Sequence, residues 1–297
     1  MKPLFMWAGG KTKVIKHYLP YMPTEVDTYY EPFFGGGAMF IHMMNEYNPR
    51  HVFINDINND IMQIYRSVRD RFASFCAFLN VYEEAYIPLN KSDRKKYYYD
   101  LRYKHAYDYE AWDEHKTAAT LYFLMKTGFN GIFQINKNTN NRYGTPSGLL
   151  NQKTQVYDRN VLQWWHDALQ GVTISSKDWK ESVDEEDAFY FFDPPYRTSF
   201  ADYGNSFDDQ SLQELITFSE RQSLAFICNR ADDDYFDKLT TSLRLHYFNV
   251  TYTAGRRKQV DDTFKAKKAR EVLLYKTDRV TLEELAYEGY TGTLCDV

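Results

Sequence analysis

Short apolar runs alternate along this chain with segments whose apolar residues recur every three to four positions. The short runs are of strand length, and the longer segments have the period of amphipathic helices. The predicted strands are 29–34, 51–55, 172–175, 188–192, 223–228, 243–252 and 272–276. The predicted helices are 38–47, 57–85, 118–125, 211–220, 232–241 and a short last helix that starts at Thr281. The alternation predicts an α/β fold in which the last two strands form an antiparallel pair.

A helical insertion interrupts this alternation of strands and helices. The stretch 86–128 is mostly helical in pattern and rich in tyrosine and basic residues. The following stretch, 128–153, is dense in Asn, Gly, Thr and Ser and predicts a long loop, which in a compact protein is usually functional or disordered. The predicted division is therefore a main domain of residues 1–60 and 157–297 with an insertion of residues 61–156.

Composition and charge are those of a globular protein. The 297 residues carry a net charge of −5, and the 26 Tyr and 21 Phe supply many rings for stacking. The net charge argues against a protein that coats nucleic acid, although 255–270 is locally basic. The three cysteines lack metal-ligand spacing, and no apolar run reaches membrane-spanning length. We expect a cytoplasmic protein that binds no membrane.

The strongest candidate for chemistry is Asp193-Pro194-Pro195-Tyr196, which directly follows the predicted strand 188–192. An acid at the carboxyl end of a parallel strand lies where α/β proteins bind ligands. The prolines fix the backbone, the Asp193 carboxylate and a proline carbonyl accept N–H groups, and the Tyr196 ring stacks. Such a pocket suits a flat ring that carries an exocyclic amine.

A glycine turn connects the first predicted strand to the first predicted helix. The segment Glu31-Pro32-Phe33-Phe34-Gly35-Gly36-Gly37 lets a ligand approach the backbone at a helix N-terminus. Asp56 ends the next strand, 21 residues after Gly35, a spacing typical of an acid that accepts both hydroxyls of a ribose. The pair indicates either a nicotinamide dinucleotide or S-adenosylmethionine, and a purely structural turn is the alternative.

Three further segments are ambiguous when each is taken alone. The run 7–12 ends in Gly-Lys-Thr like a phosphate loop, but Phe5 stands where the first glycine is required, so ATP chemistry is not expected. Asp178 follows another predicted strand and is either a ligand for an adenine amino group or a helix N-cap. Phe129-Asn130-Gly131 is either a simple turn or a pair that fills the hole left by an extruded base. The acidic run 184–187 is interpreted as a solvated turn, and no metal site is predicted.

Together, five segments of the chain resemble in order the motifs of the Dam-type family of DNA adenine-N6 methyltransferases. They are Trp7-Ala8-Gly9-Gly10-Lys11, Glu31-Pro32-Phe33 with its glycines, Asn55-Asp56-Ile57-Asn58, Gly128-Phe129-Asn130-Gly131 and Asp193-Pro194-Pro195-Tyr196. The last strand, 271–276, is similar too, so the resemblance covers nearly the whole chain. It implies a Rossmann-like S-adenosylmethionine-dependent methyltransferase sheet, with the insertion 61–156 as a mainly helical target-recognition domain.

The resemblance also implies roles for individual residues. With S-adenosylmethionine as cofactor and duplex DNA as substrate, a flipped-out adenine would stack on Tyr196 and donate its amine hydrogens to Asp193 and the Pro194 carbonyl. The implied cofactor-binding residues are Trp7, Lys11, Phe33, Phe34, Gly35, Gly37, Asp56, Ile57, Asp178 and Asp193. The expected DNA-binding residues are Phe129, Asn130, Gln134, Asn136, Lys137 and Arg142, with Arg256, Arg257 and Lys258 on phosphates.

Two positions depart from those relatives that recognise GATC. Met6 stands where a lysine is usual, and Gln134 stands where an arginine is expected. Because Arg and Lys are the usual guanine readers while Gln more often pairs with adenine, we expect a target other than GATC. The alternatives that stay open are an enzyme acting on RNA adenine or cytosine N4, and a catalytically inactive DNA-binding relative.

Overall fold

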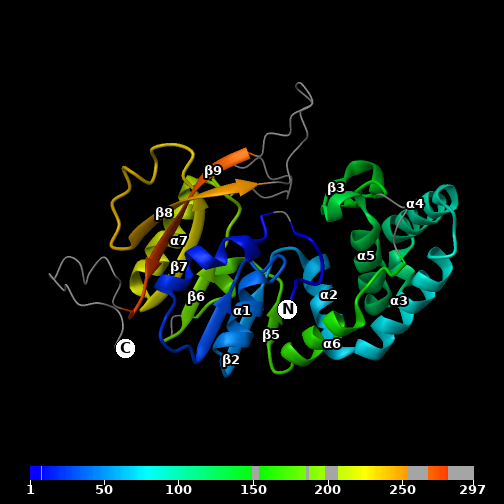
Figure 1. Cartoon of the computed structure of the whole chain (residues 1–297), viewed down its shortest axis with the longest axis horizontal. Helices are drawn as coiled ribbons and strands as arrows, with labels where there is room; N and C mark the ends of the chain where they lie inside the picture. Colours follow the sequence, from blue (N-terminus) through cyan, green and yellow to red (C-terminus); the bar gives the residue numbers. More distant parts are fainter. Residues whose placement is uncertain (8, 149–153, 185–186, 198–206, 253–266, 280–297) are drawn as a thin grey trace. The chain divides into compact units, whose positions relative to one another are not determined.

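The computed structural model describes residues 1–7, 9–148, 154–184, 187–197, 207–252 and 267–279. One seven-stranded sheet has the strand order β5-β2-β1-β6-β7-β9-β8 (Figure 1). The bounds are β1 Thr28–Glu31, β2 His51–Asn55, β5 Thr173–Ser175, β6 Phe189–Phe192, β7 Leu224–Arg230, β8 Arg244–Tyr252 and β9 Lys267–Lys276. The pairs β2–β5 and β6–β7 are parallel, whereas β9 is antiparallel to both β7 and β8. The α/β class and the closing antiparallel pair are confirmed.

Most of the described helices begin at a residue whose polar side chain caps them. The helices are α1 Ala38–Glu46, α2 Asn59–Asp70, α3 Phe72–Tyr86, α4 Lys91–Tyr107, α5 Glu114–Thr127, α6 Arg159–Ala168 and α7 Asp209–Arg221. In five of them, the side-chain oxygen of the preceding Asn or Asp accepts a hydrogen bond from the first turn. The predicted helix 57–85 is two helices, because Arg71 leaves the helical region with φ −136° and ψ 40°.

The described residues fall into two compact units. The first contains residues 1–12 and 30–184, and the second contains residues 13–29, 187–197 and 207–279. The strand β1 belongs in part to each. The domain division predicted from the sequence, with an insertion at 61–156, stays a prediction.

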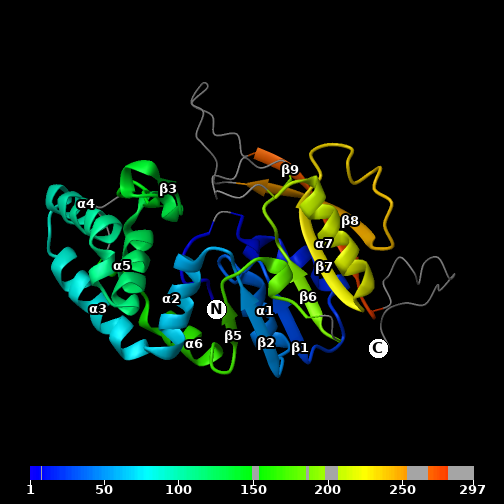
Figure 2. The same ribbon diagram turned by 180° about the vertical axis from the view of Figure 1, so that it is seen from behind.

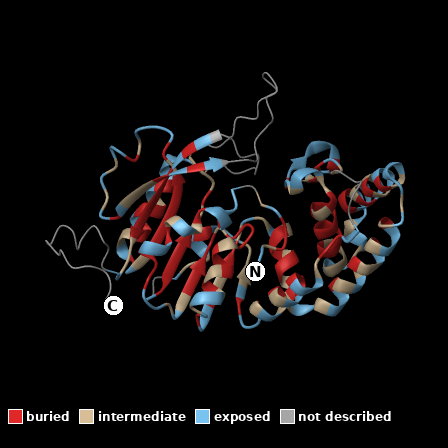
Figure 3. Cartoon of the chain, viewed as in Figure 1, coloured by how far each residue is buried: buried red, intermediate tan, exposed pale blue. Residues whose placement is uncertain are grey.

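The core of the first unit is rich in aromatic rings. Trp165 of α6 is fully buried and stacks on Phe40 of α1, with the ring centroids 5.3 Å apart. Helix α5 packs against α2, α3 and α4, and it is the most continuously buried of these helices, whereas α3 and α4 carry many exposed positions (Figure 3). Burying one large apolar side chain stabilises a fold by about 1.5–3 kcal/mol, so each of these buried rings contributes on that order to the first unit.

The core of the second unit lies on both faces of its strands. On one face α7 packs on β7 (Figure 2). There Phe218 meets the rings of Tyr190 and Phe192, with centroids 5.4 and 5.9 Å apart. Side chains alternate between faces along a strand, so Phe191 and its register partner Phe226 point to the opposite face. There they meet Tyr18, a fully buried residue.

Two expectations about local structure need correction. The predicted helix 232–241 is wrong, because this stretch forms turns: the Asp233 carboxylate accepts from the Tyr235 N–H at 3.1 Å and also pairs with Arg197. Aspartate side chains that bond nearby backbone groups compete with helix formation in this way. The loop predicted at 128–153 contains a short antiparallel pair, β3 Ile135–Asn136 and β4 Arg142–Tyr143. The helix expected from Thr281 lies outside the described residues.

Asn55, the last residue of β2, joins the ends of neighbouring strands in the first unit. Its Nδ2 donates to the carbonyls of Pro32 and Lys177 at 3.1 and 3.0 Å. Its Oδ1 accepts from the Ser175 hydroxyl at 2.8 Å and from the Lys177 N–H at 3.0 Å. The residue is only 3% exposed, so its loss would leave these groups without the partner that now satisfies them.

We therefore predict that Asn55→Ala lowers the free energy of unfolding by about 2–4 kcal/mol, since each buried group left unsatisfied costs about 1–3 kcal/mol. Urea denaturation measures the change. The control is Asn160→Ala at an exposed position of α6, where we expect a change within about 0.5 kcal/mol. Equal effects of the two substitutions would contradict a structural role for the Asn55 side chain.

Candidate active site

The turn after β1 is held by the carboxylate of Asp56, which directly follows β2. The Gly35 N–H donates to Oδ2 at 2.9 Å, and the Asn58 N–H donates to Oδ1 at 2.9 Å. Gly35 and Gly37 adopt φ values of 47° and 64°, a left-handed conformation that favours glycine. Each carboxylate oxygen has more than one acceptor lone pair, so holding this turn is compatible with accepting the hydroxyls of a ribose.

The indole of Trp7 packs directly on this glycine turn. A Cβ at Gly35 would lie 2.5 Å from Trp7 Nε1, and a Cβ at Gly36 would lie 3.0 Å from Trp7 Cβ. The indole also contacts the rings of Phe133 and Phe5, whose centroids are 5.7 and 6.1 Å away. The structure therefore brings together Trp7, the glycine turn and Asp56, three parts of the cofactor site predicted from the sequence.

Tyr65 of α2 supports the same turn, a role that was not predicted from the sequence. Its hydroxyl donates to the Gly35 carbonyl at 3.0 Å. Burial, followed by the carboxylates of Glu31 and Asp56, raises the pKa of Tyr65 well above its ordinary value. The phenol therefore keeps its proton and remains a donor to the turn.

Lys11 and Asp178 both have polar contacts within the first unit. The Lys11 ammonium donates to the Gly9 carbonyl at 2.8 Å, and the residue is 4% exposed. Oδ1 of Asp178 accepts from the Lys180 N–H at 3.0 Å and caps a short 3-10 helix, Trp179–Glu181. The capping role considered for Asp178 is present, and its contact with an adenine ring stays a prediction.

The remaining apolar residues predicted for the cofactor site differ in exposure. Phe33 is partly exposed and tilts against Trp179, with the ring centroids 6.4 Å apart. Ile57 is 55% exposed. Phe34 is buried and meets Tyr65 edge to face at 4.8 Å, so its ring supports the turn from the core side.

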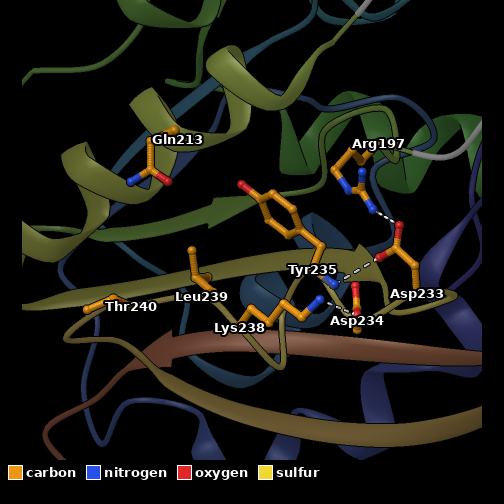
Figure 4. Close-up of a pocket in the computed structure, with 8 residues that line it drawn as sticks. All are labelled: Arg197, Gln213, Asp233, Asp234, Tyr235, Lys238, Leu239 and Thr240. Atoms are coloured by element: carbon orange, nitrogen blue, oxygen red, sulfur yellow. Dashed lines mark hydrogen bonds and ion pairs between the residues drawn. The ribbon is translucent and has the colours of Figure 1, made fainter.

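The predicted catalytic residues belong to the second unit, where segment 193–197 follows β6. Tyr196 donates its hydroxyl to Oε1 of Glu271 at 3.3 Å. The next residue, Arg197, pairs with Asp233 and with Asp209, and its guanidinium lies 4.5 Å from the ring centroid of Tyr235 (Figure 4). Glu271 and Arg197 were not predicted as site residues: Arg197 adjoins the motif, whereas Glu271 is 75 residues away from Tyr196.

A surface hollow of about 530 Å³ lies beside this segment, lined in part by Arg197, Asp233, Tyr235 and Lys238 (Figure 4). None of the predicted catalytic or cofactor-binding residues lines it. Its charged side chains are largely paired with one another, as Arg197 is with Asp233 and Lys238 with Asp234. The hollow is therefore not the predicted active site.

The residues predicted to bind DNA lie on the segment that contains β3 and β4. Gln134, Asn136 and Lys137 are exposed, and Phe129 is 46% exposed. Asn130 has a left-handed backbone with φ 53°, which asparagine tolerates better than most residues. These residues share one short surface segment, as a role in target recognition requires.

Arg142 is engaged within the protein. Its guanidinium lies 3.7 Å from the ring centroid of Tyr109, and Nη2 is 3.5 Å from Oδ1 of Asp60. Recognition of a base by Arg142 therefore requires these contacts to break. Met6, one of the two departures, lies against the same loop, since a Cβ at Gly131 would be 2.8 Å from Met6 Cβ.

The predicted phosphate-binding residues Arg256, Arg257 and Lys258 lie outside the described residues, and their role stays a prediction. Within the described part of the chain, no group of three His, Cys, Asp or Glu side chains is arranged to hold a metal ion. The same part contains no helix that is long and apolar enough to cross a membrane.

The mixed α/β sheet and the acid-supported glycine turn are consistent with a Rossmann-like methyltransferase fold. The model of the D12 class N6 adenine-specific DNA methyltransferases matches residues 7–258. The chain belongs to this family. The predicted family and enzyme class are thereby confirmed: the protein is a site-specific DNA adenine methyltransferase.

Curated relatives cover most of the chain. The type II methyltransferase M.MjaIII of Methanocaldococcus jannaschii is 30% identical over 275 residues, which are 86% of this chain and 92% of the relative. The type II methyltransferase M.CviBI of Paramecium bursaria Chlorella virus NC1A is 30% identical over 224 residues, 73% and 78% of the two chains. The DNA adenine methylase of Haemophilus influenzae is 25% identical in an alignment of 251 residues that covers 80% of this chain and 82% of the relative.

The contact between Trp7 and the glycine turn generates a prediction with a matched control. Gly35→Ala adds a Cβ at positive φ and also displaces the Trp7 indole, whereas Gly171→Ala adds a Cβ at φ 76° with no atom within 4 Å. Since overpacking costs about 1–3 kcal/mol, we expect Gly35→Ala to be less stable than Gly171→Ala by about that amount. Urea denaturation of both variants tests this, and equal free energies of unfolding would show that Trp7 does not pack on the turn.

Proposed function

We propose that this enzyme transfers the methyl group of S-adenosylmethionine to N6 of an adenine that it flips out of duplex DNA. The observation that carries the proposal is the Asp56 carboxylate bound to the Gly35 N–H, with Trp7 packed on the turn. An acid at this place accepts ribose hydroxyls, and the aromatic ring gives a nucleoside or a sulfonium a surface to contact. The three cysteines are odd in number and lack metal-ligand spacing, which supports a reducing, cytoplasmic setting.

The side chains of the first unit fit the chemical groups of S-adenosylmethionine. Asp56 would accept from the ribose hydroxyls, and Lys11 would pair with the carboxylate of the methionine part. The turn 33–37 and Trp7 would surround the methionine part, Ile57 would contact the cofactor, and Asp178 would accept from the adenine amino group. When bound, the cofactor supplies an electrophilic methyl group on a positively charged sulfur.

The segment 193–197 would supply the groups that activate the target amine. Adenine N6 is a poor nucleophile because its lone pair is delocalised into the ring. Hydrogen bonds from its two hydrogens to the Asp193 carboxylate and the Pro194 carbonyl favour a tetrahedral nitrogen with a localised lone pair. As the bond from N6 to the methyl carbon forms, the sulfur–methyl bond would break with its electron pair left on a neutral thioether, and N6 would then release one proton to water. The attack depends mainly on alignment, and the Tyr196 ring would stack on the extruded base and orient it.

Asp193→Ala should lower methyl transfer by about 10²- to 10³-fold, because it removes an electrostatic contact to the reacting amine. The measurement is transfer of labelled methyl from S-adenosylmethionine to genomic DNA that lacks adenine methylation. Asp187→Ala removes an exposed acid of the same unit and should retain wild-type activity. Wild-type activity of Asp193→Ala, with thermal unfolding unchanged, would refute the proposed role of Asp193.

Asp56→Asn should weaken binding of S-adenosylmethionine about tenfold, because an amide has one acceptor oxygen where the carboxylate has two. Isothermal titration calorimetry with the cofactor alone measures the dissociation constant. Asp70→Asn, at the end of α2 where the acid pairs with Arg69, is the control and should bind like the wild type. Failure of the wild-type protein to bind the cofactor would favour an inactive DNA-binding relative.

A further inference from the structure

We propose that Glu271 is a positioning residue for methyl transfer and that it acts through the hydroxyl group of Tyr196. The inference rests on the proposed function, in which the Tyr196 ring stacks on the extruded adenine. It starts from the burial of Glu271, which lies on β9 with 0% of its surface exposed. Acidic side chains are almost never fully buried unless they are paired, so this position needs an explanation.

Strand register shows which face of the sheet Glu271 occupies. In the antiparallel register, the backbone of Glu271 lies opposite Arg230 of β7 and Phe248 of β8. Cross-strand partners share a face, and Phe226 lies on the same face of β7, four residues before Arg230. The Tyr18 ring packs against both Phe226 and Phe248, at 6.5 and 5.8 Å. The Glu271 carboxylate therefore lies on the face that carries this aromatic layer, opposite to α7.

Tyr196 reaches this carboxylate from the end of β6. Its hydroxyl donates to Oε1 of Glu271 at 3.3 Å. A tyrosine side chain has only two rotatable torsions, so a fixed acceptor at the hydroxyl restricts both the position and the plane of the ring. The next residue, Arg197, is held by its ion pairs with Asp209 and Asp233. Side-chain contacts thus hold two consecutive residues of the segment.

Stacking on a base requires the ring of Tyr196 and makes no use of its hydroxyl group. The hydroxyl instead donates a hydrogen bond to the buried carboxylate of Glu271, which fixes the orientation of the ring before a base binds. Catalysis by alignment is sensitive to errors of about 1 Å, so loss of this contact should slow transfer even when the ring is retained. Glu271 is then linked to the reaction only through Tyr196, and that link can be tested.

The test is a double-mutant cycle with Glu271→Gln, Tyr196→Phe and the variant that combines them. The readouts are kcat, KM for S-adenosylmethionine, and the fluorescence of 2-aminopurine at the target adenine of a duplex whose site has been mapped by sequencing. We expect each single variant to lower kcat about five- to tenfold, to reduce the 2-aminopurine signal and to leave KM for the cofactor unchanged. The combined variant should be no slower than the slower single variant.

Multiplied effects in the combined variant, or wild-type kcat in both single variants, would overturn the proposal. Tyr275→Phe is the matched control, because it removes a hydroxyl from another buried residue on the same face of β9 and should keep wild-type kcat. If Glu271→Gln does not fold, Glu271→Asp takes its place, since it withdraws the carboxylate by one methylene. A wild-type protein that transfers no methyl to DNA would refute the proposed function itself, whereas an active wild type with multiplied effects refutes only the role of Glu271.

Discussion

The hydrogen bond from the Gly35 N–H to the Asp56 carboxylate is the contact on which the predicted cofactor site depends. It joins the turn after β1 to the end of β2, and the Phe34 N–H adds a second link by donating to the Asn55 carbonyl at 2.9 Å. These hydrogen bonds hold the turn. Because Gly35 and Gly36 carry no side chain, Trp7 can pack directly on their backbone. Asn55 and Asp56 are consecutive in sequence but have different roles. Asn55 is buried and joins the strand ends, whereas Asp56 is partly exposed and holds the turn.

The features that the sequence predicted well are local ones. The strand 51–55 is found with the predicted bounds, because an apolar run of strand length ends there at a polar residue. The spacing between Gly35 and Asp56 suggested a ribose-binding acid, and the structure adds a contact between the two residues, which follow neighbouring strands of one sheet. Motif order carried the family assignment, which the family match over residues 7–258 confirms.

Contacts that depend on packing could not be predicted from the sequence. Tyr65 reaches the Gly35 carbonyl across 30 residues, and nothing in its local pattern marks it. Tyr196 belongs to a predicted motif, but no local pattern indicates its partner Glu271, which lies 75 residues away. The helix expected at 232–241 fails for a different reason, since its aspartates bond to nearby backbone and to Arg197. Arg142 was predicted to bind DNA because arginine is a usual base reader, but its guanidinium contacts Tyr109 and Asp60 in the structure.

We infer that the enzyme methylates adenine N6 in DNA, with the acid-supported glycine turn binding the cofactor and the segment 193–197 activating the amine. The most direct measurement is mass spectrometry of nucleosides after the enzyme has acted on unmethylated DNA and, separately, on RNA, with S-adenosylmethionine that carries a deuterated methyl group. The predicted result is labelled N6-methyldeoxyadenosine from DNA and no labelled nucleoside from RNA. Label on cytosine N4, label in RNA, or no label in any nucleoside would contradict the account.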